Sequence, residues 1–451
     1  MEISITHGWA LHVINHTNTL AGQFELEQRN RLLNVDALRG FALLGILAVN
    51  IWAFADPYYT TTQSNPAYAS GLDQAVRFFI SLFFETKFYL LFSFLFGYSF
   101  TLQMASAERA ERAFFPRMLR RQSGLLAVGL LHGAVLYYGE ILSIYAILGL
   151  ILLACRGFPP GRAVRVGVGL VVTMGMLWML LGVVAMTQDA VMGSDLTSVN
   201  AKLAAFSDDA MATLGYHTSH LPETVATLVM LQGPSAMAMF FLGLAAGRVR
   251  FFENPDRYRM YTHRILLIAL PIGSVGALTY ALTATYVPGG AYEIIAFGLG
   301  QLTAPLLTSS YVVAALMLFR TKPGQRIEQA LASMGKMALT NYLGQSLLLG
   351  ILFTGYGFGL IDRLSPLIVL VIVPFVFAIQ LLFSHWWLKH HLYGPGEWVL
   401  RAITIAAIPA WRRNQNTVQQ TLAAGDAATA AEPKPSGQSD QVVSATRPLQ
   451  P

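Results

Sequence analysis

The chain has 451 residues, of which 54% are hydrophobic and only 12% are charged. Ordinary soluble domains carry about 25% charged residues, and a soluble protein of this length could not cover its surface with so few charges. The composition excludes a soluble enzyme, a fibrous chain and a disordered chain, and it favours a protein that crosses a membrane many times. The net charge of +6 comes from clusters between apolar runs, which argues against a nucleic-acid partner.

The apolar runs predict an all-α bundle of about ten membrane spans within residues 29–413. Residues 1–28 contain no long apolar core and are expected to form an N-terminal extension rather than a secretory signal. The single cysteine, Cys155, leaves no intrachain disulfide. The ten predicted spans cover residues 35–54, 78–103, 122–138, 140–155, 163–186, 230–247, 265–286, 292–319, 337–354 and 364–384.

The positions of the lysines and arginines support an even number of spans. Leaving out the tail 414–451, 23 of the 30 basic residues lie before the first predicted span or in the segments that follow the even-numbered spans. The alternate connections hold only Arg77, Lys202 and Arg363. Because basic residues concentrate on the cytoplasmic side of membrane proteins, we expect both termini in the cytoplasm.

Three segments outside the spans have distinct compositions. Connection 187–229 is long and polar, and we expect an extracytoplasmic lid or small helical cap. A short cytoplasmic helix is predicted over about 396–412, and residues 414–451, rich in Ala, Gln, Ser and Pro, are predicted to be a disordered cytoplasmic tail. The histidines lack carboxylates at ligand spacing, so no metal site is expected.

Ionisable side chains at membrane depth are costly and are therefore functional candidates. Asp36 and Arg39 lie three residues apart on one helix face, where they can pair with each other or Arg39 can bind a phosphate-bearing ligand. Asn50 lies about 16 Å further along the same helix and suits either interhelical hydrogen bonding or a cavity wall. Glu85 and Lys87 mark either the boundary between a short interfacial helix and the true span or the lining of the same cavity as Asn50.

His132 lies within the third predicted span, about 16 Å beyond Arg121. A buried histidine is often structural, but imidazole also exchanges protons near neutral pH. Glu140, eight residues later, is a candidate to orient it. Further along the chain, two pairs with i, i+4 spacing are candidate structural polar groups, Asn341 with Gln345 and Glu397 with Arg401.

Five strings occur in order along residues 30–405: VDALRGFALLGILAVN, KFYLLFSFLFGYSF, GLLHGAVLYYGEIL, GKMALTNYLGQS and YGPGEWVLR. They resemble the successive motifs of the YeiB-like family of bacterial inner-membrane proteins, which carry a domain of unknown function. Through the DALRG string, that family is more remotely similar to the transmembrane acyltransferase superfamily, which includes the acyltransferase-three proteins and the lysosomal heparan-glucosaminide N-acetyltransferase. The resemblance implies an inner-membrane bundle of about ten helices, a cytoplasmic acyl-CoA donor (usually acetyl-CoA) and an outer acceptor such as an envelope sugar.

One position departs from the superfamily pattern. Acyltransferase-three proteins carry an arginine and, after ten intervening residues, a catalytic histidine, but the same interval from Arg39 ends at Asn50. An amide cannot act as a general base. Either His132 supplies the base, or the chemistry has been lost and the cavity binds or moves a solute.

Three hypotheses follow. In the first, an acyltransferase, Asp36, Arg39 and Arg121 form the donor site, and His132 is the general base that Glu140 orients. Asn50 and Lys87 would then stabilise the oxyanion. In the second, the same polar groups line the path of a transporter or flippase for a small anionic or lipid-linked solute. In the third, the chain is a non-catalytic membrane component of an envelope complex. The expected partners are the lipid bilayer, the donor and the acceptor, and a homo-oligomer remains open.

Overall fold

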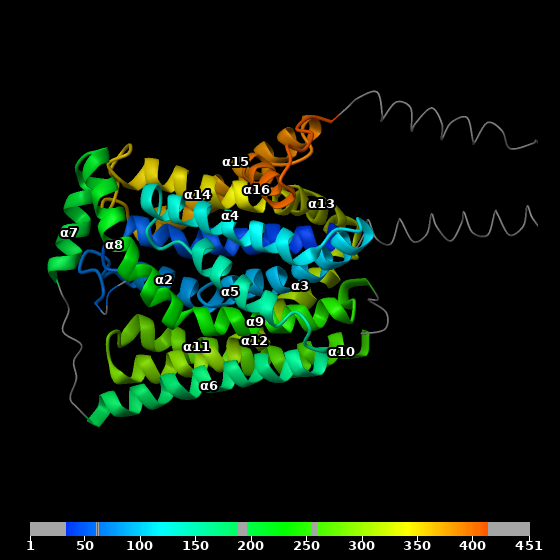
Figure 1. The fold of residues 1–451 in the computed structure, drawn as a ribbon. Helices are drawn as coiled ribbons and strands as arrows, with labels where there is room; N and C mark the ends of the chain where they lie inside the picture. Colours follow the sequence, from blue (N-terminus) through cyan, green and yellow to red (C-terminus); the bar gives the residue numbers. More distant parts are fainter. Residues whose placement is uncertain (1–32, 60, 62, 188–195, 254–258, 414–451) are drawn as a thin grey trace, which may run out of the picture.

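The computed structural model describes residues 33–59, 61, 63–187, 196–253 and 259–413, so the predicted extension 1–28 and tail 414–451 lie outside it. Long helices run side by side, with α7 at one end of the bundle and α10 and α13 at the other (Figure 1). The all-α prediction is confirmed.

The first helix spans Leu33–Ala55. It is followed by α2 (Gly71–Phe83), α3 (Lys87–Arg109), α4 (Phe114–Val135), α5 (Leu142–Ala154), α6 (Pro160–Thr187), α7 (Leu196–Ser207), α8 (Ala210–Leu231), α9 (Gly233–Arg248), η1 (Phe251–Glu253), α10 (Arg259–Arg264), η2 (Ile265–Ala269), α11 (Leu270–Tyr286), α12 (Ala291–Phe319), α13 (Lys322–Lys336), α14 (Ala338–Phe353), α15 (Pro366–His390) and α16 (Pro395–Ile405).

Helices within the described residues differ in their capacity to cross a membrane. Six are long and apolar enough to do so, and a seventh span results if α8 and α9, which meet at a bend of 55°, are taken together. The apolar helices α5 and α14 have only 13 and 16 residues. Each of the ten predicted spans overlaps a helix, and the second, 78–103, overlaps both α2 and α3. The number ten and the side on which the termini lie stay predictions.

Small residues allow the central helices to approach closely. A Cβ atom on Gly243 of α9 would lie 2.1 Å from the carbonyl oxygen of Phe94 in α3. A Cβ atom on Gly335 of α13 would lie 1.8 Å from the carbonyl oxygen of Asp36 in the first helix. Only glycine fits such backbone contacts, which are typical of packed membrane helices. The second contact fixes the end of α13 beside the Asp36 and Arg39 turn.

The second predicted span is interrupted in the structure. The chain leaves helical geometry between α2 and α3, where Thr86 adopts a left-handed φ of 70°. Lys87 Nζ donates to the carbonyl oxygen of Ser81 at 2.8 Å, while Glu85 pairs with Arg77 at 2.8 Å. Glu85 and Lys87 therefore mark the boundary between a shorter helix and the longer one, which was one of the two expectations for them.

About half of the polar connection predicted over 187–229 belongs to one long helix, α8. Residues 188–195 lie outside the description, α7 follows, and the 22-residue α8 then packs against α4 and α9. His217 of α8 is completely buried among aromatic rings, and the ring of His220 stacks on that of Tyr216 with centroids 3.9 Å apart. The segment is thus part of the helical bundle as well as a cover at the α7 end.

Candidate functional site

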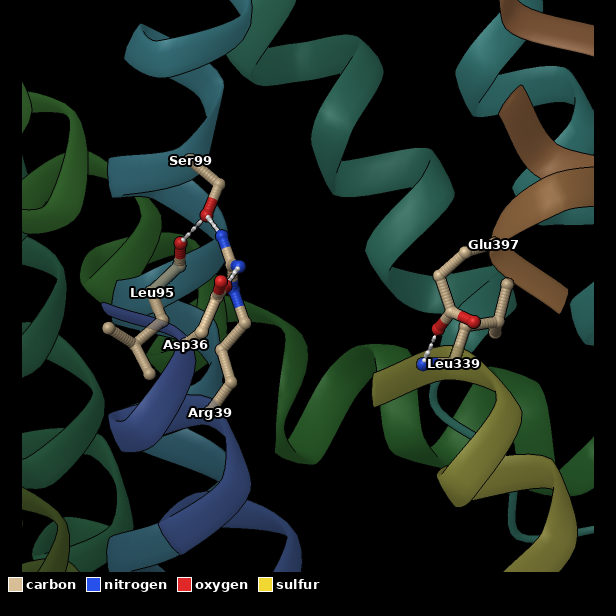
Figure 2. A network of polar contacts seen from close by, with 6 residues as sticks. All are labelled: Asp36, Arg39, Leu95, Ser99, Leu339 and Glu397. Carbon is tan, nitrogen blue, oxygen red and sulfur yellow. Dashed lines mark hydrogen bonds and ion pairs between the residues drawn. The ribbon is translucent and has the colours of Figure 1, made fainter. Parts of the chain in front are cut away.

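Arg39 of the first helix is held in a fixed orientation by two partners (Figure 2). Its Nη1 forms an ion pair with the carboxylate of Asp36, one turn earlier, and its Nη2 donates to Ser99 Oγ of α3 at 2.5 Å. Ser99 Oγ in turn donates to the carbonyl oxygen of Leu95. The predicted Asp36–Arg39 pair is confirmed, and the guanidinium is preorganised rather than mobile.

A cavity of about 320 Å³, which we call the basic pocket, lies beside Arg39. Five basic residues and one acidic residue line it: Arg39, Arg117, Arg121, Lys336, Arg401 and Glu397. The rest of its lining is mostly apolar or aromatic. Guanidinium groups bind phosphate oxygens in a bidentate manner, so the cavity suits a phosphate-bearing molecule with an apolar portion. It brings together Arg39 and Arg121, whereas Asp36 does not line it and acts through Arg39.

Glu397 faces Arg39 from the other side of this region and fixes the C-terminal helix (Figure 2). Its carboxylate accepts hydrogen bonds from the backbone N–H groups of Leu339 at 2.6 Å and Thr340 at 3.1 Å, and from Thr340 Oγ1 at 2.6 Å. The two backbone donors lie in the first turn of α14, where N–H groups have no partner within the helix, and Glu397 supplies that partner. Arg401, one turn along α16, lines the basic pocket and lies over the ring of Tyr393.

A second cavity of about 240 Å³, the aromatic pocket, adjoins the basic pocket. Four residues, Ile46, Ile141, Tyr145 and Tyr342, line both cavities. Asn50 lines the aromatic pocket, as one expectation for it required. Six tyrosines contribute to its wall: Tyr59, Tyr89, Tyr137, Tyr138, Tyr145 and Tyr342. The two pockets lie in succession along the first helix, from Arg39 to Asn50.

His132 lies behind the wall of the aromatic pocket and lines neither cavity. It is 3% exposed, and its ring packs against those of Tyr342 and Tyr137, at 5.1 and 6.4 Å between centroids. Neither ring nitrogen has a hydrogen-bond partner among the described residues. A buried polar group without a partner requires an explanation, and a functional role is one.

Glu140 and Lys87 do not take the positions expected of them beside His132 and Asn50. The Glu140 carboxylate accepts hydrogen bonds from the backbone N–H groups of Leu142 at 2.6 Å and Ser143 at 3.0 Å, and from Ser143 Oγ. It therefore caps α5 and forms no hydrogen bond with the ring nitrogens of His132. Lys87 is 2% exposed, lines neither pocket and is engaged by the Ser81 carbonyl.

Asn341 and Gln345 act as interhelical hydrogen-bonding groups. Asn341 Nδ2 donates to Ser384 Oγ of α15 at 2.8 Å, and Gln345 Nε2 donates to the carbonyl oxygen of Leu43 in the first helix at 3.2 Å. Gln380 Nε2 of α15 donates to the carbonyl oxygen of Asn341 at 2.8 Å. These bonds tie α14 to its two neighbours, and the intervening Tyr342 is thereby positioned between the pockets.

A third cavity, the acidic pocket of about 90 Å³, follows the end of the first helix. Asp56, Asp73 and Glu293 line it together with Trp52 and Arg77. Burial raises the pKa of the Asp56 carboxyl above its usual range. Tyr59 lines both this cavity and the aromatic pocket. Asp56 lies 17 residues beyond Arg39, about 25 Å along a helix axis, so the acidic and basic pockets lie at opposite ends.

Several of these lining residues were not among the sequence candidates. Arg117 precedes Arg121 by one helical turn, and i, i+4 spacing could have identified it. Tyr342 lies inside the quoted string GKMALTNYLGQS, between the two residues assigned there. Tyr145 and Lys336 give no local signal, because their role depends on helices that are distant in sequence.

Comparison with known proteins finds similar chains over most of this length. A family described as a protein of unknown function (DUF418) matches residues 246–407. The uncharacterized protein YxaH of Bacillus subtilis (strain 168) is 31% identical over 398 residues, covering 82% of this chain and 93% of that protein. The uncharacterized protein YeiB of Escherichia coli (strain K12) is 28% identical over 387 residues, covering 84% of this chain and 97% of that protein.

Proposed function

The chain belongs to the YeiB-like family of membrane proteins, and from its pockets we propose that it transfers an acyl group from a cytoplasmic acyl-CoA to an acceptor on the other side of the bacterial inner membrane. The observation that carries the proposal is the succession of a basic, an aromatic and an acidic pocket through the bundle. Four shared lining residues connect the basic and aromatic pockets, and Tyr59 connects the aromatic pocket to the acidic one.

The basic pocket suits the donor. Arg39, Arg121 and their neighbours Arg117, Lys336 and Arg401 bind the phosphates of coenzyme A near the cavity mouth. The uncharged pantetheine arm follows the apolar lining toward Tyr145 and Tyr342. The thioester, usually an acetyl group in the similar superfamily, then reaches the aromatic pocket beside Asn50.

The proposed transfer takes place in the aromatic pocket. A hydroxyl or amine of the acceptor attacks the thioester carbonyl carbon, a bond from that oxygen or nitrogen to the acyl carbon forms, and the carbon–sulfur bond breaks. His132 takes the proton from the acceptor and returns it to the departing thiolate, which leaves as free coenzyme A. The amide N–H of Asn50 stabilises the oxyanion. Because His132 lies one layer behind the wall, this role requires its ring to reach the cavity past Tyr342 or Tyr137.

The charge distribution argues against transport of a small anion. An anion that enters the basic pocket would have to leave through a cavity lined by three carboxylates, Asp56, Asp73 and Glu293. Like charges in a partly buried site repel strongly. Group transfer avoids this barrier, because the anionic donor stays at the basic end and only the acyl group passes to the acceptor.

Donor binding tests the proposal directly. Acetyl-CoA and a panel of other CoA thioesters should raise the melting temperature of the detergent-purified protein, because ligand at a hundred times its Kd stabilises a folded protein by about 2.7 kcal/mol. The variant Arg39→Lys keeps the charge but loses the planar fork that binds phosphate. It should bind acetyl-CoA about 10- to 150-fold more weakly, which corresponds to the loss of one charge-assisted hydrogen bond of about 1.5–3 kcal/mol.

The control is Arg112→Lys, an exposed position that lines none of the three pockets. Its acetyl-CoA affinity should equal that of the wild type. If no CoA thioester stabilises the protein, the enzyme proposal fails. Solute flux in proteoliposomes without an acyl donor would then support the transporter hypothesis instead.

A further inference from the structure

Two buried polar atoms at the acidic pocket lack hydrogen-bond partners within the part of the chain that the structure describes. They are Nε1 of Trp52, a residue 5% exposed, and Oγ1 of Thr285, a residue 8% exposed, and both residues line the cavity. Proteins rarely leave such atoms unsatisfied because each costs folding free energy. A bound molecule would supply the missing partners. Because an indole N–H can only donate, that molecule must carry an acceptor oxygen.

The charged groups around the acidic pocket determine which charge a bound molecule should carry. Asp56 is fixed by hydrogen bonds to its Oδ1 from Tyr58 N at 2.9 Å and from Asn65 Nδ2 at 3.0 Å, and Asn65 Nδ2 also donates to Asp362 at 2.7 Å. Five carboxylates line the cavity or contact residues that line it, namely Asp56, Asp73, Glu85, Glu293 and Asp362. Within the described part of the chain, only two cations do so, Arg77 and Lys202. The excess negative charge favours a cation over a neutral molecule or an anion.

The size and arrangement of the cavity restrict that cation. Among the described residues, no three of these carboxylates are grouped so that they could hold a metal ion. A volume of about 90 Å³ holds several water molecules or a group of a few non-hydrogen atoms. An organic cation that also provides a hydroxyl oxygen meets both requirements.

We propose that the acidic pocket is a subsite for a protonated amine that carries at least two hydroxyl groups. Its ammonium group lies among the carboxylates, and a hydroxyl oxygen accepts a hydrogen bond from Trp52 Nε1 while Thr285 Oγ1 bonds to the same group. The inference rests on the proposed acyl transfer. The acceptor in that reaction is this hydroxylated amine, either as a free molecule or as part of a larger headgroup.

Tyr59 connects the subsite to the reaction centre. Its ring lines both the acidic and the aromatic pocket, its hydroxyl donates to Glu85 at 2.8 Å, and Arg77 lies over its ring at 5.0 Å. The ammonium group remains protonated beside the carboxylates, so it is not the nucleophile. The nucleophile is a second hydroxyl group of the same molecule, which extends past Tyr59. Its proton passes to His132 as the oxygen–acyl bond forms, and from there to the thiolate that leaves when the carbon–sulfur bond breaks.

Three small probes of similar shape and different charge test the subsite. Ethanolamine, ethylene glycol and glycolate are added to the purified full-length protein without acyl donor, at matched ionic strength, and the melting temperature is recorded. Ethanolamine should raise it with a half-maximal concentration on the order of 1 mM, as expected for so small a ligand. Ethylene glycol should be at least tenfold weaker, and glycolate should give no shift. Equal responses to the three probes would overturn the subsite.

Thr285→Val removes one unpartnered hydroxyl at nearly constant volume, so the variant should be at least as stable as the wild type while it responds to ethanolamine about tenfold more weakly. Trp52→Phe is a second variant that removes the indole donor. Thr283→Val is the matched control, because Thr283 lies on the same helix outside the pocket and bonds to the carbonyl oxygen of Thr279. An unchanged ethanolamine response in a folded Thr285→Val or Trp52→Phe variant would refute the assignment.

Acetyl-CoA is titrated into the same samples so that the two proposals can fail separately. A response to acetyl-CoA without a response to ethanolamine rejects the subsite and leaves the donor site standing. A response to ethanolamine without a response to acetyl-CoA supports the subsite and rejects the enzyme proposal.

Discussion

His132 is the residue on which the proposed chemistry depends most. It is buried, its two ring nitrogens lack hydrogen-bond partners among the described residues, and its ring packs on two tyrosines of the aromatic pocket. A buried histidine with a purely structural role is expected to form a hydrogen bond through at least one ring nitrogen. The unpartnered ring is therefore consistent with a group that forms its hydrogen bond only when an acceptor is bound.

Replacing His132 with glutamine should separate catalysis from donor binding. His132→Gln keeps approximate size and hydrogen-bonding capacity but removes the basic ring nitrogen that can take up a proton. We expect the rate of acyl transfer to fall by roughly 10²–10⁴-fold, the range for loss of a positioned acid–base group, with an unchanged acetyl-CoA shift. His385→Gln, an exposed position on α15, is the control. A folded His132→Gln protein with normal turnover would exclude His132 as the base.

At the scale of elements, the sequence predicted helices well and their breaks less well. The ten apolar runs all became helices, because hydropathy over about 20 residues is a property of the local sequence. The interruption between α2 and α3 was visible as Glu85 and Lys87, but the left-handed Thr86 was not. α8 was expected only as part of a lid or small helical cap, because its sequence mixes apolar residues with polar ones, of which the structure buries only Thr213 and His217.

Lys202 of α7 is a buried cation whose protonation makes the free energy of unfolding depend on pH. It is 2% exposed, and its Nζ donates to the carbonyl oxygen of Asp56 at 3.3 Å. Burial lowers the pKa of Lys202 to about 8, from an ordinary value of 10.5. Between these two values the unfolded chain binds more protons than the folded one, so this group makes the free energy of unfolding increase with pH, by about 1.4 kcal/mol per unit.

Lys202→Met removes the buried cation and should be more stable than the wild type at pH 7. The difference should shrink as the pH rises from 8 to 10, because the wild type then loses the cost of burying its charge. Melting temperatures of both proteins at four pH values give this difference, in which other titrations cancel. Lys389→Met, an exposed position, should show a pH-independent difference. A constant gap between Lys202→Met and wild type would contradict the shifted pKa.

At the scale of the whole molecule, the candidate site depends on how distant segments meet. The Asp36–Arg39 pair and the polar stripe of Asn341 and Gln345 could be predicted because each lies on one helix. The joining of the basic and aromatic pockets by Tyr145 and Tyr342 could not, since these residues are almost 200 positions apart. Glu140 was misassigned for the same reason: its carboxylate caps the next helix instead of reaching His132.

The orientation of the molecule in the membrane decides which pocket meets which compartment. The basic residues concentrate on one set of connections, which predicts that the basic pocket and both termini face the cytoplasm. The acidic pocket and α7 would then face outward. On this orientation an acyl-CoA made in the cytoplasm meets Arg39, and an acceptor from outside meets Asp56.

Cysteine labelling in whole cells tests this orientation. Cys155 is first replaced, and single cysteines are introduced as Ser198→Cys, at an exposed position of α7, and Ser436→Cys, in the tail outside the described residues. An impermeant thiol reagent should label position 198 in intact cells and position 436 only after the membrane is permeabilised. Labelling of position 436 but not 198 in intact cells would show that the molecule has the opposite orientation in the membrane. It would place the basic pocket on the side where no acyl-CoA is made, and the acyltransferase proposal would then fail together with the topology.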